Sequence, residues 1–169
     1  SGTLETLTAS AATGDISAIV DGTKATVTTG SGADVITVDT TAISKAIDLG
    51  AGNDTLVLSN VGTVTVPTAA VKGGEGTDTI SMNVASAISL DGNEDFKNAI
   101  SGFERLEINN VVTSAQTIDL ANLGFTSYVT TSGTSGATYA GVVAAATDAE
   151  TFTFVYNGTS YTATLNDAA

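Results

Sequence analysis

The sequence predicts an all-β fold in which short strands, joined by repeated tight turns, stack into a solenoid. One glycine-aspartate pattern occurs three times between residues 29 and 82. A large apolar residue follows each aspartate by two positions, as expected where a chain leaves a turn as a strand with one buried face. Hydrophobic residues make up 42% of the chain and charged residues only 14%, a balance that argues against disorder.

The repeated pattern is Gly-x-Gly-x-Asp. The third copy, residues 73–81, is a complete match to the calcium-binding nonapeptide G-G-x-G-x-D-x-U-x, and the first two lack only its leading glycine. Glycine adopts tight-turn torsions cheaply, so several carbonyl oxygens can point at one ion. Calcium takes about 6–8 oxygen ligands from carboxylates and backbone carbonyls. The pattern therefore predicts a Ca²⁺ site built from Gly30, Gly32, Asp34, Gly50, Gly52, Asp54, Gly74, Gly76 and Asp78.

These turns resemble those of the RTX (repeats-in-toxin) family, whose repeats form a right-handed parallel β-roll with calcium bound between stacked turns. That family includes type I secreted toxins, proteases, lipases, adhesins and bacterial surface-layer proteins. The resemblance covers residues 29–82 and extends more weakly to about residue 110. The phrase Ser-Gly-Phe-Glu-Arg-Leu at residues 101–106 resembles a segment that commonly follows such coils in surface-layer and RTX proteins.

The spacing of the aspartates departs from the family pattern. Asp34 and Asp54 are 20 residues apart and Asp54 and Asp78 are 24 apart, whereas a family coil of two nonapeptides has about 18. We infer that the glycine turns stack along one edge, while the opposite edge turns without calcium near residues 39–41 and 60–62. We expect at least two ions, one in each interval between successive glycine turns. Sparse coils of this kind favour a surface-layer protein.

Three regions are expected along the chain. Residues 1–28 form an N-terminal cap or degenerate coil, residues 29–110 the calcium-binding β-roll, and residues 111–169 a smaller β-rich C-terminal module. Asp15 lies in a worn copy of the glycine turn, and Asp95 is a candidate for a degenerate fourth turn.

Residues 29–90 are predicted to be the repeat core. The apolar residues expected to face inward are Ile36, Val38, Ile47, Leu49, Leu56, Leu58, Val71, Ile80 and Met82. One helical turn is expected over residues 96–100. In the C-terminal region, Asn157-Gly158 separates two alternating runs, which predicts a β-hairpin over residues 151–165. Its aromatic residues are interpreted as core, with a sugar-binding platform as the alternative.

The chain is strongly acidic, with 18 acids, 5 bases and a net charge of −13. No Lys/Arg cluster exists, which argues against nucleic acid and anionic membranes as partners, and no apolar run approaches the ~20 residues of a membrane span. The acids have two interpretations: they bind divalent cations, or they keep an extracellular protein soluble. Three aspartates in matched loops favour cation binding.

The sequence contains no histidine and no cysteine, so the commonest catalytic bases and nucleophiles are absent, and we predict that the chain is not an enzyme. Three functions remain: a structural module of a bacterial surface layer, a calcium-dependent region of a secreted adhesin, or the RTX secretion domain of a type I secreted enzyme or toxin. The first is favoured, at an extracellular location on the bacterial cell surface. Its expected partners are copies of itself in a surface array or neighbouring domains of a longer chain, with cell-surface polysaccharide as a further candidate.

Overall fold

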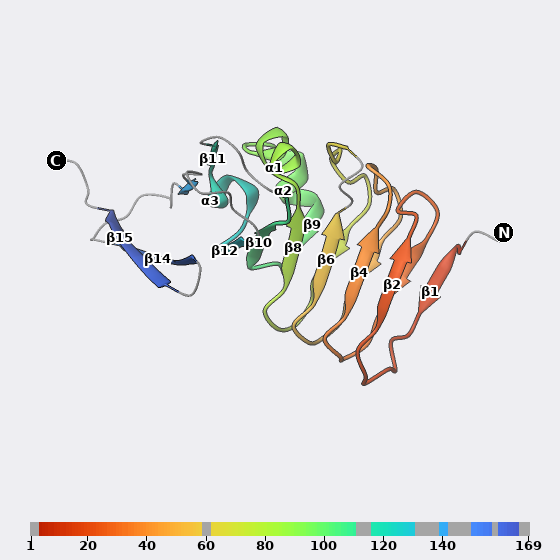
Figure 1. The fold of residues 1–169 in the computed structure, drawn as a ribbon. Coiled ribbons are helices and arrows are strands. Elements are labelled where there is room, and N and C mark those ends of the chain that lie inside the picture. Colours follow the sequence, from red (N-terminus) through yellow and green to blue (C-terminus); the bar gives the residue numbers. More distant parts are fainter. Residues whose placement is uncertain are drawn as a thin grey trace.

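The computed structural model describes residues 4–58, 62–110, 116–130, 139–141, 150–156 and 159–165. Two sheets of parallel strands dominate it (Figure 1). Sheet A contains, in spatial order, β1 (Thr6–Thr8), β3 (Thr26–Thr28), β5 (Ile47–Asp48), β7 (Val71–Lys72) and β9 (Ile100–Ser101). Sheet B contains β2 (Ser17–Val20), β4 (Val35–Val38), β6 (Thr55–Leu58), β8 (Thr79–Met82), β10 (Arg105–Ile108) and β12 (Ser127–Thr130).

From β1 to β10 the chain passes alternately through the two sheets, so successive strands of each sheet come from successive coils. Every neighbouring pair in both sheets is parallel. The result is a β-solenoid of about four turns, which confirms the predicted parallel β-roll. Sheet B begins with β2 and ends with β12, so it extends on both sides of residues 29–110. The division into three regions stays a prediction.

Equivalent apolar residues stack on one another because the strands pair in register. Ile36 pairs with Leu56, Leu56 with Ile80, and Ile80 with Leu106. A slip of one residue would turn every one of these side chains to the other face of the sheet. The buried row therefore fixes how the coils, and with them the turns, lie on one another.

The two edges of the solenoid carry different turns. The glycine edge leads from sheet A to sheet B, and its three motif turns have six residues each: 29–34, 49–54 and 73–78. The opposite edge leads from sheet B back to sheet A, and its connections lengthen along the chain: 21–25, 39–46, 59–70 and 83–99. The predicted separation into a glycine edge and an opposite edge is confirmed. The growth of the opposite turns accounts for the rise in aspartate spacing from 20 to 24 residues.

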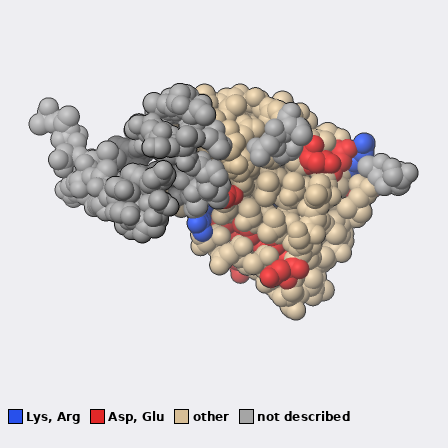
Figure 2. Space-filling view, viewed as in Figure 1, with Lys and Arg blue, Asp and Glu red and all other residues tan. Residues whose placement is uncertain are grey.

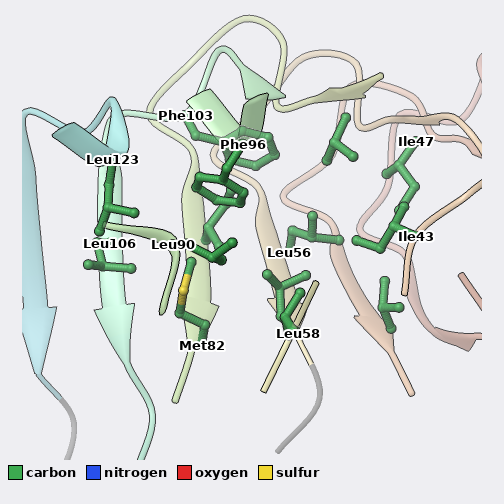
Figure 3. Close-up of a cluster of buried hydrophobic side chains, with 14 of the residues drawn as sticks. Ile43, Ile47, Leu56, Leu58, Met82, Leu90, Phe96, Phe103, Leu106 and Leu123 are labelled. Carbon is green, nitrogen blue, oxygen red and sulfur yellow. The ribbon is translucent and has the colours of Figure 1, made fainter. Parts of the chain in front are cut away.

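The core lies between the two sheets, and the aromatic side chains of Phe96 and Phe103 lie toward its C-terminal part (Figure 3). All nine residues predicted to face inward are buried, none with more than 2% of its surface exposed. Leu90, Phe96 and Phe103 enlarge the core beyond Met82. Burial of this apolar surface is the main stabilising contribution to a fold of this kind.

Within the described residues, three short helices lie in the C-terminal coils: α1 (Val84–Leu90), α2 (Glu94–Ala99) and α3 (Leu120–Leu123). The side chains of Asn83 and Asn93 accept backbone N–H bonds at the starts of α1 and α2, as N-cap residues do. The helical turn predicted at residues 96–100 is confirmed and begins earlier, at Glu94. Helix α1 lies within the predicted repeat core, residues 29–90, where no helix was expected. No helix in the described part of the chain is long and apolar enough to cross a membrane.

The C-terminal region contains further strands. β11 (Gln116–Ile118) pairs in parallel with β13 (Tyr139–Gly141). β14 (Glu150–Tyr156) pairs antiparallel with β15 (Thr159–Leu165), and Phe154 lies opposite Tyr161 in the register. The predicted hairpin is thus confirmed, while Asn157-Gly158 at its turn lies outside the described residues.

Candidate functional site

The stacking of the coils brings the three predicted aspartates into one column on the glycine edge. Because Val35, Thr55 and Thr79 pair with one another, the residues before them are equivalent. Asp34, Asp54 and Asp78 are called the aspartate column below. The flanking coils place Ile16 and Glu104 at the same position, since Ser17 pairs with Val35 and Arg105 with Thr79.

Each aspartate of the column reaches back to the preceding coil. Oδ1 of Asp54 accepts a hydrogen bond from the backbone N–H of Asp34 at 2.7 Å, and Oδ1 of Asp78 accepts one from Asp54 at 2.8 Å. Oδ1 of Asp34 accepts the backbone N–H of Ile16 at 2.8 Å. One oxygen of every carboxylate therefore serves to join two coils.

The second oxygen of each column carboxylate has no such partner. Asp34 and Asp78 have no exposed surface and Asp54 has 1%. Oδ2 of all three residues is buried and lacks a hydrogen-bond partner within the described residues. Burying a carboxylate oxygen without a compensating partner is costly. Three such oxygens, one per coil, make the aspartate column a candidate cation site.

The surroundings raise the pKa values of two column carboxylates, Asp54 and Asp78. Burial raises the pKa of Asp54 to about 6; the hydrogen bond from Asp34 opposes this rise, and the carboxylates of Asp78 and Asp34 add to it. Burial also raises the pKa of Asp78, and the nearby charge of Glu104 raises it further. A pKa of about 6 leaves Asp54 largely ionised at neutral pH. The buried, unpartnered oxygen of Asp54 therefore carries negative charge.

The glycines allow backbone carbonyls of one coil to approach the next. Gly74 and Gly76 have φ values of 118° and 135°, which residues with a Cβ rarely adopt. A Cβ at Gly74 would collide with the carbonyl oxygen of Gly50, and one at Gly76 with that of Gly52. Gly30 lacks a positive φ, but a Cβ at this position would collide with the carbonyl oxygen of Ala12 in the first coil. The glycine pattern thus brings carbonyl oxygens close to the neighbouring coil along the edge that holds the column.

The available ligands fit calcium only if carboxylates and carbonyls act together. No group of three or more His, Cys, Asp or Glu side chains in the described ranges could hold a metal ion by itself. The column supplies one carboxylate per coil, so backbone carbonyls would complete the coordination. That mixture of oxygens is what calcium accepts and what a softer metal such as zinc does not prefer.

The two candidate degenerate turns have different outcomes. Asp95 lies in helix α2 and not in a turn of the glycine edge, so that prediction is wrong. Asp15 does lie in the first turn, but Ile16 occupies the column position; Oδ1 of Asp15 accepts the backbone N–H of Ala33 at 2.8 Å. It is therefore adjacent to the column and not part of it.

Glu104 occupies the column position in the following coil, although the glycine pattern did not mark it. Its Oε2 accepts the backbone N–H of Asp78 at 2.9 Å, as the column aspartates do for their own neighbours. The sequence held a signal for it, because Leu106 follows Glu104 by two positions just as Ile80 follows Asp78. The turn that ends at Glu104 has only three residues, 102–104. It is too short to contain the Gly-x-Gly-x-Asp pattern.

Further acids are exposed on the same edge, including Asp15 and Glu75. Figure 2 shows acidic side chains along the lower side of the molecule, where Figure 1 places the turns that lead into β2, β4, β6 and β8. No family model, curated protein or solved structure matches this chain. The assignment of a function therefore depends on the site itself.

Proposed function

We propose that this chain is a non-catalytic, calcium-stabilised structural module of a secreted bacterial surface-layer protein, in which it contributes to cell-surface assembly. The observation that carries the proposal is the aspartate column, with three buried carboxylates that each have an unpartnered oxygen. The resemblance of the glycine turns to those of the RTX family supports it. Calcium in this role would act as a structural ion.

The residues that would hold calcium are Asp34, Asp54 and Asp78, with backbone carbonyls from the glycine turns. When bound, the ion supplies positive charge between coils. Adjacent strands lie about 5 Å apart, and two carboxylates at that distance repel by roughly 3 kcal/mol at an effective dielectric near 20. This is a large fraction of a typical domain stability of about 5–15 kcal/mol, so neutralising the column would strongly favour the stacked form.

The acidity of the whole chain supports an extracellular role. A net charge of −13 opposes compact folding and close contact between copies through self-repulsion. Calcium relieves both kinds of repulsion, because it binds the stacked coils and screens exposed acids. The exterior of a bacterium is rich in free calcium while the cytosol is poor in it. The chain would thus fold and associate after export.

The proposal is tested by calorimetry and by imaging of assembly in the same buffers. We expect calcium to bind at millimolar concentration or below, with magnesium substituting poorly because it demands a tight octahedron. We also expect ordered assemblies by electron microscopy in calcium and their dispersal in chelator. Asp54→Asn, which removes the central charge of the column, should weaken both effects.

The outcomes separate the two parts of the proposal. Absence of calcium binding would reject it entirely. Calcium binding without any association, at all concentrations of protein and calcium, would retain the calcium-stabilised module and reject its role in surface assembly.

A further inference from the structure

We propose that the glycine edge holds a third cation position, between the turn 73–78 and the short closing turn 102–104, with Glu104 as its second carboxylate. This inference rests on the proposed calcium binding of the aspartate column. The glycine pattern marks two intervals between motif turns, yet three aspartates have a buried oxygen without a partner. The third such oxygen, Oδ2 of Asp78, would need a cation position outside the two intervals that the pattern marks.

The position of Gly73 shows where the free oxygen of Asp78 lies. A Cβ at Gly73 would collide with the carbonyl oxygen of Gly102, in the following coil, and would stand 2.6 Å from Oδ2 of Asp78. The carbonyl oxygen of Gly102 and Oδ2 of Asp78 therefore both lie close to the Cα of Gly73, on the side that faces the closing turn. Oδ1 of Asp78 is directed the other way, toward the N–H of Asp54. The two carboxylate oxygens of Asp78 thus lie toward different neighbours: Oδ1 toward the preceding motif turn and Oδ2 toward the closing turn.

Glu104 brings a second carboxylate to this interval. Its Oε2 lies 2.9 Å from the backbone nitrogen of Asp78, although its turn has half the residues of the motif turns. The extra methylene of glutamate explains how a shorter turn still delivers an acceptor to the column position. Asp78 Oδ2, the Glu104 carboxylate and the carbonyl of Gly102 together provide oxygen ligands of the kinds that calcium uses.

An ion in this place would connect the glycine edge to the C-terminal coils. The carbonyl of Glu104 accepts backbone N–H bonds from Thr126 at 2.9 Å and from Ser127 at 3.0 Å. Ser127 begins β12, the last strand of sheet B. Calcium held by Asp78 and Glu104 would therefore join the third motif turn to β10 and, through the backbone of Glu104, to β12.

The test counts bound calcium on the full chain by native mass spectrometry and measures affinities by calorimetry. Glu104→Gln keeps an oxygen that can accept the N–H of Asp78 but removes the charge. We expect this variant to bind one calcium fewer than the unaltered protein. Glu107→Gln is the matched control, because Glu107 lies three residues after Glu104, on β10, is also half-buried, and is outside the column. It should keep the full count.

Melting curves distinguish a metal ligand from a purely structural residue. In chelator, Glu104→Gln should melt no lower than the unaltered protein, whereas its gain in melting temperature on adding calcium should be smaller. If Glu104→Gln lowered the melting temperature equally in chelator and in calcium, Glu104 would be only a hydrogen-bond acceptor. That result would overturn the inference. An unchanged count and affinity in Glu104→Gln would overturn it too, while leaving the proposed function intact. No calcium on the unaltered protein would reject both.

Discussion

The two edges of the solenoid differ in how freely their turns vary. On the glycine edge the three motif turns keep the same length, and their aspartates stay in one column. On the opposite edge each connection is longer than the one before it, from five residues at 21–25 to seventeen at 83–99. Repeated chemistry therefore constrains one edge, while changes in coil length accumulate at the other.

The difference has a physical cause. On the glycine edge the backbones of adjacent turns nearly touch, so an inserted residue would displace both the carbonyls and the column carboxylates. On the opposite edge ordinary devices satisfy the turns: Ser86 accepts the backbone N–H of Val64 at 2.9 Å, and Asn83 caps α1. The Asn83 cap is local to its own coil, and the Ser86 bond joins a single pair of coils, so neither imposes one length on all the connections of this edge. The helices α1 and α2 show how much chain this edge accommodates.

Truncation of the opposite-edge core should have the largest effect on stability. Phe96 is fully buried in α2, and Phe96→Ala should cost about 3–5 kcal/mol of unfolding free energy. The loss should be the same in calcium and in chelator, because Phe96 is not in the column. Urea denaturation in both buffers measures it. A loss confined to calcium would contradict the separation of the two edges.

Replacing a glycine with alanine should lower the free energy of unfolding more on the glycine edge than on the opposite edge. Gly76→Ala introduces a Cβ at a φ of 135° that would collide with the carbonyl of Gly52, and the torsional strain alone is worth about 1–3 kcal/mol. Gly62→Ala, on the opposite edge, would meet only the methyl tip of Thr41 at 3.2 Å, so we expect a change within about 1 kcal/mol. Equal losses in thermal unfolding would show that the edges are equally constrained.

In chelator, acid should stabilise the glycine edge. The folded-state pKa of Asp54 is raised from 3.8 to about 6, so the folded form binds the proton more tightly than the unfolded form. The penalty is nearly complete at pH 7 and is relieved as pH falls through 6 toward 4. One such group contributes about 1 kcal/mol between pH 7 and pH 5.

Asp54→Asn is the control for this pH dependence. The variant lacks the titrating group, so it should be more stable than the unaltered protein at pH 7 and should gain less on acidification. Denaturant titrations at several pH values measure both quantities. An identical pH dependence in the two proteins would show that Asp54 does not carry the buried charge.

The sequence was sufficient for the features that repeat. The three glycine turns, the inward apolar rows and the C-terminal hairpin follow from local patterns, and the structure confirms the fold they predict. Features set by tertiary context were missed. Helix α1 forms from Val84–Leu90 beyond a capping asparagine, in a stretch without a clear helical period. Glu104 joins the column through a turn too short to show glycine spacing, and Asp95 resembled a column residue only by its distance along the chain.

The most direct test of the account is hydrogen exchange with and without calcium, read separately for the two edges. Binding to the folded form alone stabilises by about 2.7 kcal/mol per site at a calcium concentration 100 times the dissociation constant. We predict that calcium slows exchange most at residues 29–34, 49–54 and 73–78, less at 39–46, and that magnesium has little effect. Superimposable exchange in calcium and in chelator would contradict the claim that the aspartate column is a calcium site.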